Sequence, residues 1–179
     1  MSPSQLLRGG GMAAVLGSAL LILATLLTLI YLSIFSPDLA SESDDTVMQI
    51  RSFVGVVGRM LLVVGLVALY LRHSEIMGTL GLIGFLLALL GLVAGPIGAV
   101  VSLLANLGWA LFGVASLQAE VYPRAAAVLL IAGALLTGPI RAFPADVPDM
   151  VFLYASIILY GAIAWMGYTL WTGKDTIVE

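Results

Sequence analysis

Charged residues divide this chain into long uncharged stretches separated by short polar ones. The longest uncharged stretch covers residues 76–119, between Glu75 and Glu120. One membrane crossing needs about 20 apolar residues, and the stretch contains Gly-Pro-Ile-Gly at residues 95–98, a sequence that favours a turn. We therefore predict that residues 76–119 form two transmembrane helices joined at this turn, with the other helices arranged around them.

The remaining uncharged stretches predict four further membrane helices. Residues 9–35 carry no charge and are followed by Ser36-Pro37, a sequence that ends a helix. Ser41 and Asp44 then fit a capping box at the start of the next helix. The predicted fold is therefore all-α: one domain over residues 1–179, built as an integral membrane bundle of six transmembrane helices. In chain order, we expect these helices over residues 11–35, 42–72, 76–94, 99–118, 125–143 and 150–172.

The composition supports a chain that lies in a lipid bilayer. Of its 179 residues, 61% are hydrophobic and 9% are charged, and the mean hydropathy is +1.15. A soluble domain has about 25% charged residues, so this chain cannot form a water-facing surface. The few charges, with a net charge of −3, argue against a nucleic-acid partner. The chain has no cysteine, which excludes disulfides and thiolate metal sites.

The distribution of basic residues predicts the orientation of the six helices. With six crossings, both termini lie on the same side of the membrane. Cytoplasmic segments of membrane proteins carry an excess of Lys and Arg, so we expect both termini in the cytoplasm and the protein in the inner (plasma) membrane. In this arrangement the inner segments hold Arg8, Arg72, Arg124 and Lys174, and the outer half holds Arg51, Arg59 and Arg141.

Two neighbouring runs of residues carry a resemblance to known sequences. They are Trp109-Ala-Leu-Phe-Gly-Val-Ala-Ser-Leu and Tyr122-Pro-Arg-Ala-Ala-Ala-Val-Leu-Leu, which together cover residues 109–130. This segment resembles uncharacterised bacterial six-pass integral membrane proteins of similar length. The resemblance implies a bacterial inner-membrane protein and implies no particular chemistry.

Arg59 is the first candidate for a functional residue, because it falls inside the second predicted helix. A charge at mid-membrane costs about 2.5–3.5 kcal/mol on insertion scales, and such residues usually face the bundle interior or a wet cavity. No carboxylate lies in an apolar stretch. Its partner is therefore a backbone carbonyl at a Gly-Pro-Ile turn, an acidic loop or an external anion. In a purely structural alternative, the side chain extends to the outer interface.

Arg51 and Arg141 are expected on the same outer side as Arg59. The three arginines are candidate contacts for an anion or a lipid head group, since the guanidinium fork suits carboxylate and phosphate. Ion pairs that hold the loops are the structural alternative. The acids available for such pairs are Asp38, Glu42, Asp44, Asp45, Asp146 and Asp149.

The other polar residues of the predicted helices have simpler interpretations. Asn106, one turn after Ser102, marks a candidate polar spot inside the membrane, or else a bridge between helices. Thr25 and Thr28 can bond to their own backbone. His73 is the only histidine and cannot form a zinc or bis-histidine haem site alone, so we place it at the interface.

The sequence favours a protein without catalytic activity. It contains none of the catalytic motifs with a known mechanism, such as a P-loop or His-Glu-x-x-His. We predict no catalytic, metal or cofactor site and no bound cofactor. The expected function is a multi-pass inner-membrane protein that packs against membrane partners or holds a lipid or apolar ligand. The alternative is a small permease that recognises an anionic substrate through its outer-side arginines.

Overall fold

The computed structural model describes residues 3–34, 45–94, 98–138 and 149–173. These ranges contain five helices: α1 (Pro3–Ile34), α2 (Asp45–Ala94), α3 (Gly98–Gln118), α4 (Arg124–Thr137) and α6 (Asp149–Thr172). The expected all-α fold is confirmed. Four of the helices, α1, α2, α3 and α6, are long and apolar enough to cross a membrane, and α4 is a shorter apolar helix.

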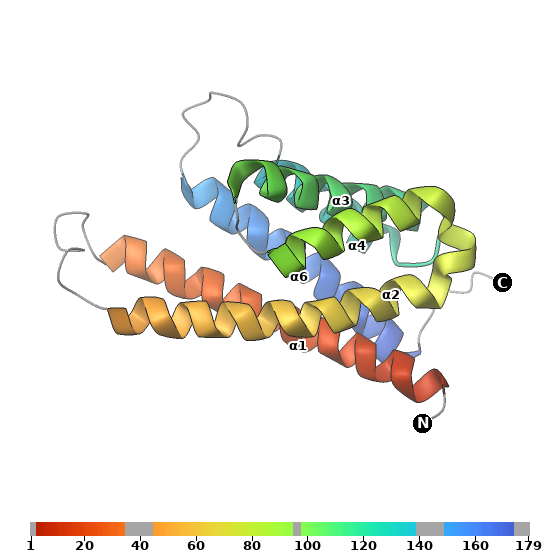
Figure 1. Cartoon of the computed structure of the whole chain (residues 1–179), viewed down its shortest axis with the longest axis horizontal. Coiled ribbons are helices and arrows are strands. Elements are labelled where there is room, and N and C mark those ends of the chain that lie inside the picture. The colour runs from red at the N-terminus through yellow and green to blue at the C-terminus, as the bar shows by residue number, and fades with distance from the viewer. Residues whose placement is uncertain (1–2, 35–44, 95–97, 139–148, 174–179) are drawn as a thin grey trace.

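The structure differs from the expected six separate helices at α2. The two helices expected over residues 42–72 and 76–94 form one helical element, with non-helical backbone only at His73 (φ −132°, ψ 19°) and Gly78 (φ 59°, ψ −159°). The positive φ of Gly78 is a conformation that glycine adopts without steric cost. The chain therefore reverses within a kinked helix, and Figure 1 shows α2 turning back at this point. We call residues 45–72 the first limb of α2 and residues 79–94 its second limb.

The other helices lie close to the expected ranges, with two differences. The first helix begins at Pro3 and not at residue 11, because proline suits the first turn of a helix and the exposed Arg8 remains within it. α3 and α6 match the expected ranges to within one residue. α4 ends at Thr137, and the expected end of this helix, residues 139–143, lies outside the described residues.

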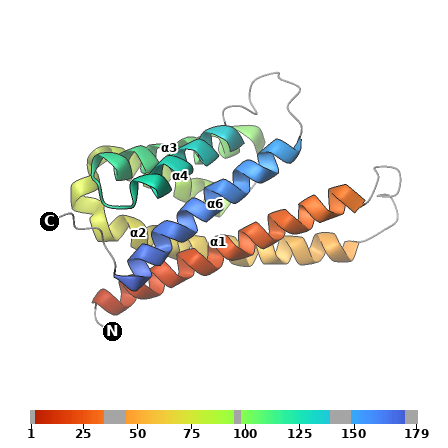
Figure 2. The same cartoon turned by 180° about the vertical axis from the view of Figure 1, so that it is seen from behind.

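The helices form a bundle in which α6 connects two halves. α1 packs along α2 and along α6, whereas α4 packs on both α6 and α3, and α3 packs on α2. The first limb of α2 lies against α1, since Gly58 approaches Gly17, and the second limb lies against α3, since Gly84 approaches Gly108. Figures 1 and 2 show α6 passing between the α1 half and the α3–α4 half.

Several helix pairs come into close contact at glycines. A Cβ atom added to Gly84 would lie 2.5 Å from the backbone nitrogen of Phe112, and one added to Gly108 would lie 2.4 Å from that of Ala88. α1 and α6 meet in the same way at Gly11 and Gly167. In lipid, small residues of this kind let helix backbones pack closely, which replaces the hydrophobic driving force that water supplies.

A hydrogen-bond cluster holds one end of the bundle. The hydroxyl of Tyr122, just before α4, donates to the carbonyl of Leu69 at 2.7 Å, and Nδ1 of His73 lies 3.3 Å from the same hydroxyl. Because the hydroxyl proton is used by Leu69, the imidazole fits here as the donor from Nδ1. In an unbroken helix the Leu69 carbonyl would accept from the backbone of residue 73. Tyr122 therefore links the α2 kink to the turn between α3 and α4.

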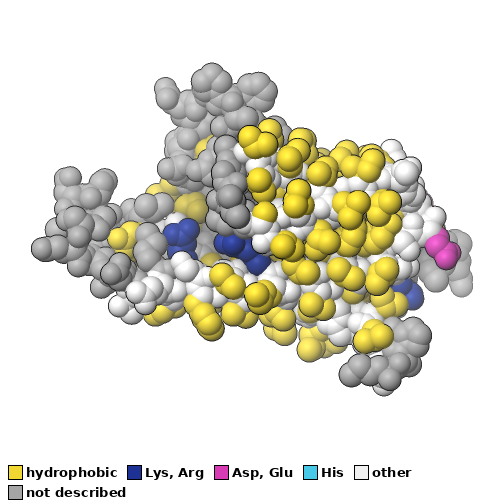
Figure 3. All heavy atoms as spheres, in the orientation of Figure 1, with side chains coloured by type: hydrophobic (Ala, Val, Ile, Leu, Met, Phe, Trp, Pro, Cys, Tyr) yellow, Lys and Arg dark blue, Asp and Glu magenta, His cyan; other side chains and the backbone are white. Residues whose placement is uncertain are grey.

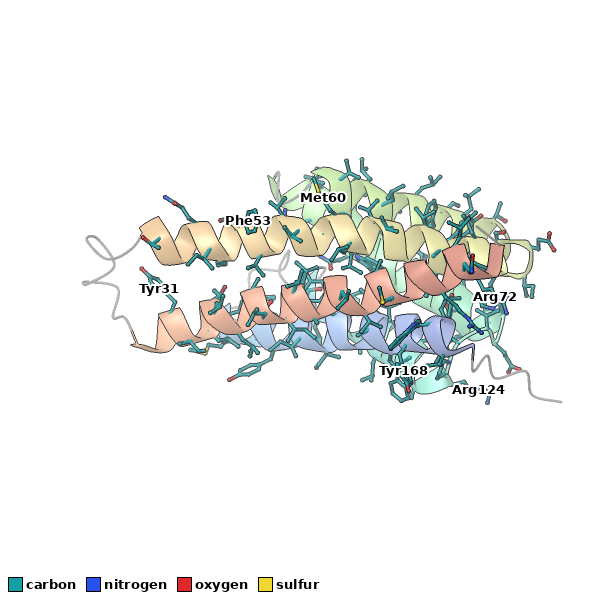
Figure 4. The ribbon with its side chains drawn as sticks, turned by 90° about the horizontal axis from the view of Figure 1, so that it is seen from below. Tyr31, Phe53, Met60, Arg72, Arg124 and Tyr168 are labelled. Atoms are coloured by element: carbon teal, nitrogen blue, oxygen red, sulfur yellow. The ribbon has the colours of Figure 1, made fainter. Side chains whose placement is uncertain are left out.

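Both ends of the described chain lie at this same end of the bundle. Gly10 approaches Ala68 near the kink, and Gly173, after α6, lies near the guanidinium of Arg8. Figure 4 shows Arg72 and Arg124 at this end, with Tyr31 and Phe53 toward the opposite one. We call it the kink end.

Candidate functional site

Arg59 lies deep within the apolar part of the first limb. The span that could cross a membrane begins at Gln49, ten residues earlier, which places Arg59 about 15 Å along the helix axis. That is half of a hydrocarbon core about 30 Å thick. A Cβ on Gly55 would lie 3.9 Å from Nη2 of Arg59, so the side chain runs back toward the start of α2. Among the described residues, none forms a hydrogen bond or ion pair with Arg59.

Arg59 borders a small polar cavity between α2, α3 and α6, which has a volume of about 190 Å³. We call it the polar cavity. It brings together residues that the sequence singled out separately, namely Arg59 with Asn106 and Ser102. Its other described lining residues are Gly91, Leu92, Ala105, Trp109, Leu159 and Tyr160.

A second cavity lies between α1, the first limb of α2 and α6, with a volume of about 310 Å³. Arg51, Arg59 and Tyr160 line it together with Thr25 and Thr28, so we call it the threonine cavity. The threonine hydroxyls donate to Leu21 and Ala24 of their own helix at 2.8 and 2.9 Å, as expected. The hydroxyl protons are therefore used within the helix, and the two arginines are the charged donors of this cavity.

A third cavity, of about 420 Å³, lies between the two limbs of α2. Its described lining consists of Val56, Arg59, Met60, Val63, Leu92, Val93 and Ala94. Arg59 is the only charged residue in this lining, so we call it the apolar cavity. Val56, Met60 and Val93 are exposed on the molecular surface, so the cavity opens on the side of the bundle. Figure 3 shows Arg side chains at the surface of this face, with hydrophobic side chains nearby.

Asn106 forms a bridge between helices. Its Nδ2 donates to the carbonyl of Ser102 at 2.8 Å, and the hydroxyl of Thr137 on α4 lies 2.8 Å from its Oδ1 as a donor. The same hydroxyl also lies 2.8 Å from the carbonyl of Gly133, so its single proton is shared between two acceptors. A side-chain hydrogen bond between membrane helices contributes about 0.6 kcal/mol. Asn106 thus holds α3 to α4 while it lines the polar cavity.

The predicted group of three arginines is placed in part. Arg51 and Arg59 line the threonine cavity together, whereas Arg141 lies outside the described residues. The sequence analysis did not single out Tyr160, yet this residue lines both the polar and the threonine cavity. An aromatic residue in an apolar helix gives no sign of the cavity that it will face. Sequence reasoning also missed Tyr122, which positions His73.

The carboxylates that the structure describes, those of Glu75 and Glu120, lie at the α2 kink and at the α3–α4 turn. Glu120 pairs with Arg124 at this exposed turn. Such an exposed pair adds little stability. Within the described part of the chain, no three His, Asp or Glu residues lie close enough to hold a metal ion. The described charge at the centre of the bundle is therefore the positive charge of Arg59.

No protein-family model, curated protein or solved structure matches this chain. The chemistry of the site therefore rests on its own residues, namely Arg59, midway along the first limb of α2, and the side chains of the polar, threonine and apolar cavities that it borders.

Proposed function

We propose that this chain is a non-catalytic, six-pass protein of the inner (plasma) membrane that holds a lipid-like ligand in the cavities around Arg59. One observation carries the proposal: Arg59 borders all three cavities and forms no hydrogen bond or ion pair with a described residue. An ionised side chain at this depth is costly and usually faces a functional cavity. A ligand with a polar end and an apolar body would offset that cost.

The shape of α2 supports six crossings. At 1.5 Å per residue, the first limb, residues 45–72, extends about 42 Å and the second limb, residues 79–94, about 24 Å. The second limb is therefore shorter than a hydrocarbon core about 30 Å thick, and we propose that the bilayer thins locally where it crosses. Both ends of the described chain lie at the kink end, which also carries Arg8, Arg72 and Arg124. By the positive-inside rule, we assign the kink end and both termini to the cytoplasm.

Single-cysteine labelling tests this topology, because the chain has no cysteine of its own. Gln49→Cys lies near the end opposite the kink, and Gln118→Cys lies at the kink end; both glutamines are exposed. In intact cells, a membrane-impermeant maleimide is expected to label Gln49→Cys and to label Gln118→Cys only after permeabilisation. The unmodified chain is the control for background labelling. The reverse pattern, or labelling of both variants in intact cells, would contradict the assignment.

Native mass spectrometry in a mild detergent tests ligand binding. The wild-type protein is expected to retain a bound mass, and Val63→Trp to reduce its occupancy about tenfold, because the larger side chain fills the apolar cavity and overpacking costs 1–3 kcal/mol. Val64→Trp is the matched control, because Val64 is the next residue along the chain, is 54% exposed and does not line the apolar cavity. Equal occupancy in all three proteins, or no bound mass in any, would contradict ligand binding at this site.

A non-catalytic role is consistent with the residues that line the three cavities. The described linings contain arginine, tyrosine, asparagine, serine, threonine and tryptophan, and they contain no histidine or carboxylate. General acid–base and nucleophilic catalysis most often use those two groups as the base. We therefore assign binding, and no reaction, to these residues.

A small permease for an anionic substrate is the second candidate. The threonine cavity extends from Arg51, near the end opposite the kink, to Arg59 and Tyr160, which also line the polar cavity beside Asn106. Arg51, Arg59 and Asn106 thus form a series of polar side chains that an anion could contact in turn along part of the bundle. The two functions differ in vesicles that contain the protein, because a permease accumulates solute over many turnovers, whereas a binding protein saturates at a fixed stoichiometry.

A further inference from the structure

We infer that the ligand is a single-chain carboxylic acid, with its carboxylate paired to Arg59 and its chain in the apolar cavity between the limbs of α2. This inference rests on the proposed ligand-binding function and specifies its chemistry. It combines two observations, the lone charge of Arg59 in the polar and apolar cavities and the apolar lining that adjoins that charge.

The charge and the donors around Arg59 match a monoanion. Arg59 is the only charged residue among the described residues that line the polar and apolar cavities. A guanidinium pairs with a carboxylate through two parallel hydrogen bonds. A buried anion also needs further donors. The residues that line the polar cavity include Tyr160, Trp109 and Asn106, whose side chains carry donor groups, although one N–H of Asn106 already donates to the Ser102 carbonyl.

The depth of Arg59 favours a carboxylic acid over a phospholipid. The site lies about 15 Å inside the apolar span, and a phosphodiester would have to carry its permanent charge through hydrocarbon to reach it. A carboxylic acid crosses hydrocarbon in its neutral form. The positive charge of Arg59 then favours ionisation of the acid, so the ion pair forms only at the site.

The size and opening of the apolar cavity fit one chain. Its volume of about 420 Å³ lies within the range of about 300–1,000 Å³ typical of ligand sites. At about 30 Å³ for a group the size of a water molecule, it accommodates on the order of a dozen methylene groups. The exposed side chains of Val56, Met60 and Val93 lie at its rim, so a chain has access directly from the bilayer.

Equilibrium binding of matched sixteen-carbon probes to the purified full-length protein tests the inference. Radiolabelled palmitate is expected to bind at least about tenfold more tightly than hexadecanol, because only the acid forms the charge-assisted pair. Arg59→Met is expected to weaken palmitate about tenfold or more and to leave hexadecanol unchanged, whereas Arg59→Lys retains part of the preference. Arg124→Met, which removes an exposed arginine at the α3–α4 turn, is the control and is expected to change neither.

Three outcomes would overturn the inference, and they are distinct from failure of the proposed function. Equal binding of acid and alcohol to the wild-type protein would show an apolar site without carboxylate recognition. Tighter binding of lysophosphatidylglycerol than of palmitate would assign the site to a phosphate lipid. An unchanged palmitate affinity in Arg59→Met would remove Arg59 from the site. In each of these cases the protein still binds a ligand, so the proposed function stands. The proposed function would also fail if no probe bound and if native mass spectrometry showed no retained mass that Val63→Trp reduces. If Arg59→Met does not fold, the comparison of acid with alcohol in the wild-type protein decides.

Discussion

Gly84→Ala is expected to lower the free energy of unfolding by about 1–3 kcal/mol, because a Cβ at this position would lie 2.5 Å from the backbone nitrogen of Phe112. The neighbouring atom belongs to a helix backbone, so relief requires the second limb of α2 to move away from α3. For a protein of this size, each kcal/mol corresponds to about 2–4 °C in Tm. Thermal unfolding in detergent, followed by circular dichroism, measures the change.

Gly161→Ala is the matched control for this substitution. Gly161 lies within α6, and a Cβ added to it meets nothing within 4 Å. Alanine in a helix interior is favoured over glycine by about 0.5–1 kcal/mol, so Gly161→Ala is expected to leave Tm unchanged or to raise it. If Gly84→Ala were as stable as Gly161→Ala, the α2–α3 contact would not depend on close backbone approach. The second limb of α2, which forms one side of the apolar cavity, would then not be held in place by close contact with α3.

The positions of the helices follow from the sequence because charges and prolines mark where the lipid ends. An uncharged stretch between Glu75 and Glu120, interrupted by Gly-Pro, leads directly to the second limb of α2 and to α3. The sequence also predicts a break between the helices expected over residues 42–72 and 76–94, and α2 is kinked at this place. The form of the break was not predicted, because the reversal needs only two non-helical residues, His73 and Gly78. A four-residue polar segment in a sequence does not distinguish a loop from a kinked helix.

The neighbours of each helix could not be predicted in the same way. Helix packing here depends on which glycines face one another, such as Gly11 with Gly167. An apolar helix presents small residues on several faces, and no water-facing side shows which face is used.

The candidate site was predictable where it depends on polarity and hidden where it depends on packing. Arg59 and Asn106 stand out because a charge and an amide are rare in apolar helices, and the structure places both around one cavity. Tyr160 and the apolar cavity between the limbs of α2 did not stand out. They arise from the fold of α2 and from the passage of α6 beside it, which are properties of the assembled bundle.

Tyr122→Phe is expected to destabilise the protein by about 2–3 kcal/mol. The hydroxyl is buried, with the residue 3% exposed, and it contacts both the Leu69 carbonyl and His73. Its loss removes two hydrogen bonds, each contributing about 0.5–1.5 kcal/mol, and leaves the Leu69 carbonyl without this donor at the α2 kink. Because the kink sets the angle between the two limbs, the apolar cavity is also expected to lose its shape. Thermal unfolding and the retained ligand mass report the two effects separately.

Tyr70→Phe is the appropriate control because the same atom is removed close to the same kink. The Tyr70 ring stacks on Phe85 with centroids 4.5 Å apart, so it joins the two limbs through its face, and its hydroxyl forms no hydrogen bond with a described residue. A change within about 0.5 kcal/mol is expected for Tyr70→Phe. His73→Ala combined with Tyr122→Phe should be less destabilising than the sum of the single changes, since neighbours in one network are not additive. Full additivity would mean that Tyr122 and His73 stabilise the protein independently of each other. The shape of the kink would then be set by the backbone of Gly78 and not by the hydrogen-bond cluster at Tyr122.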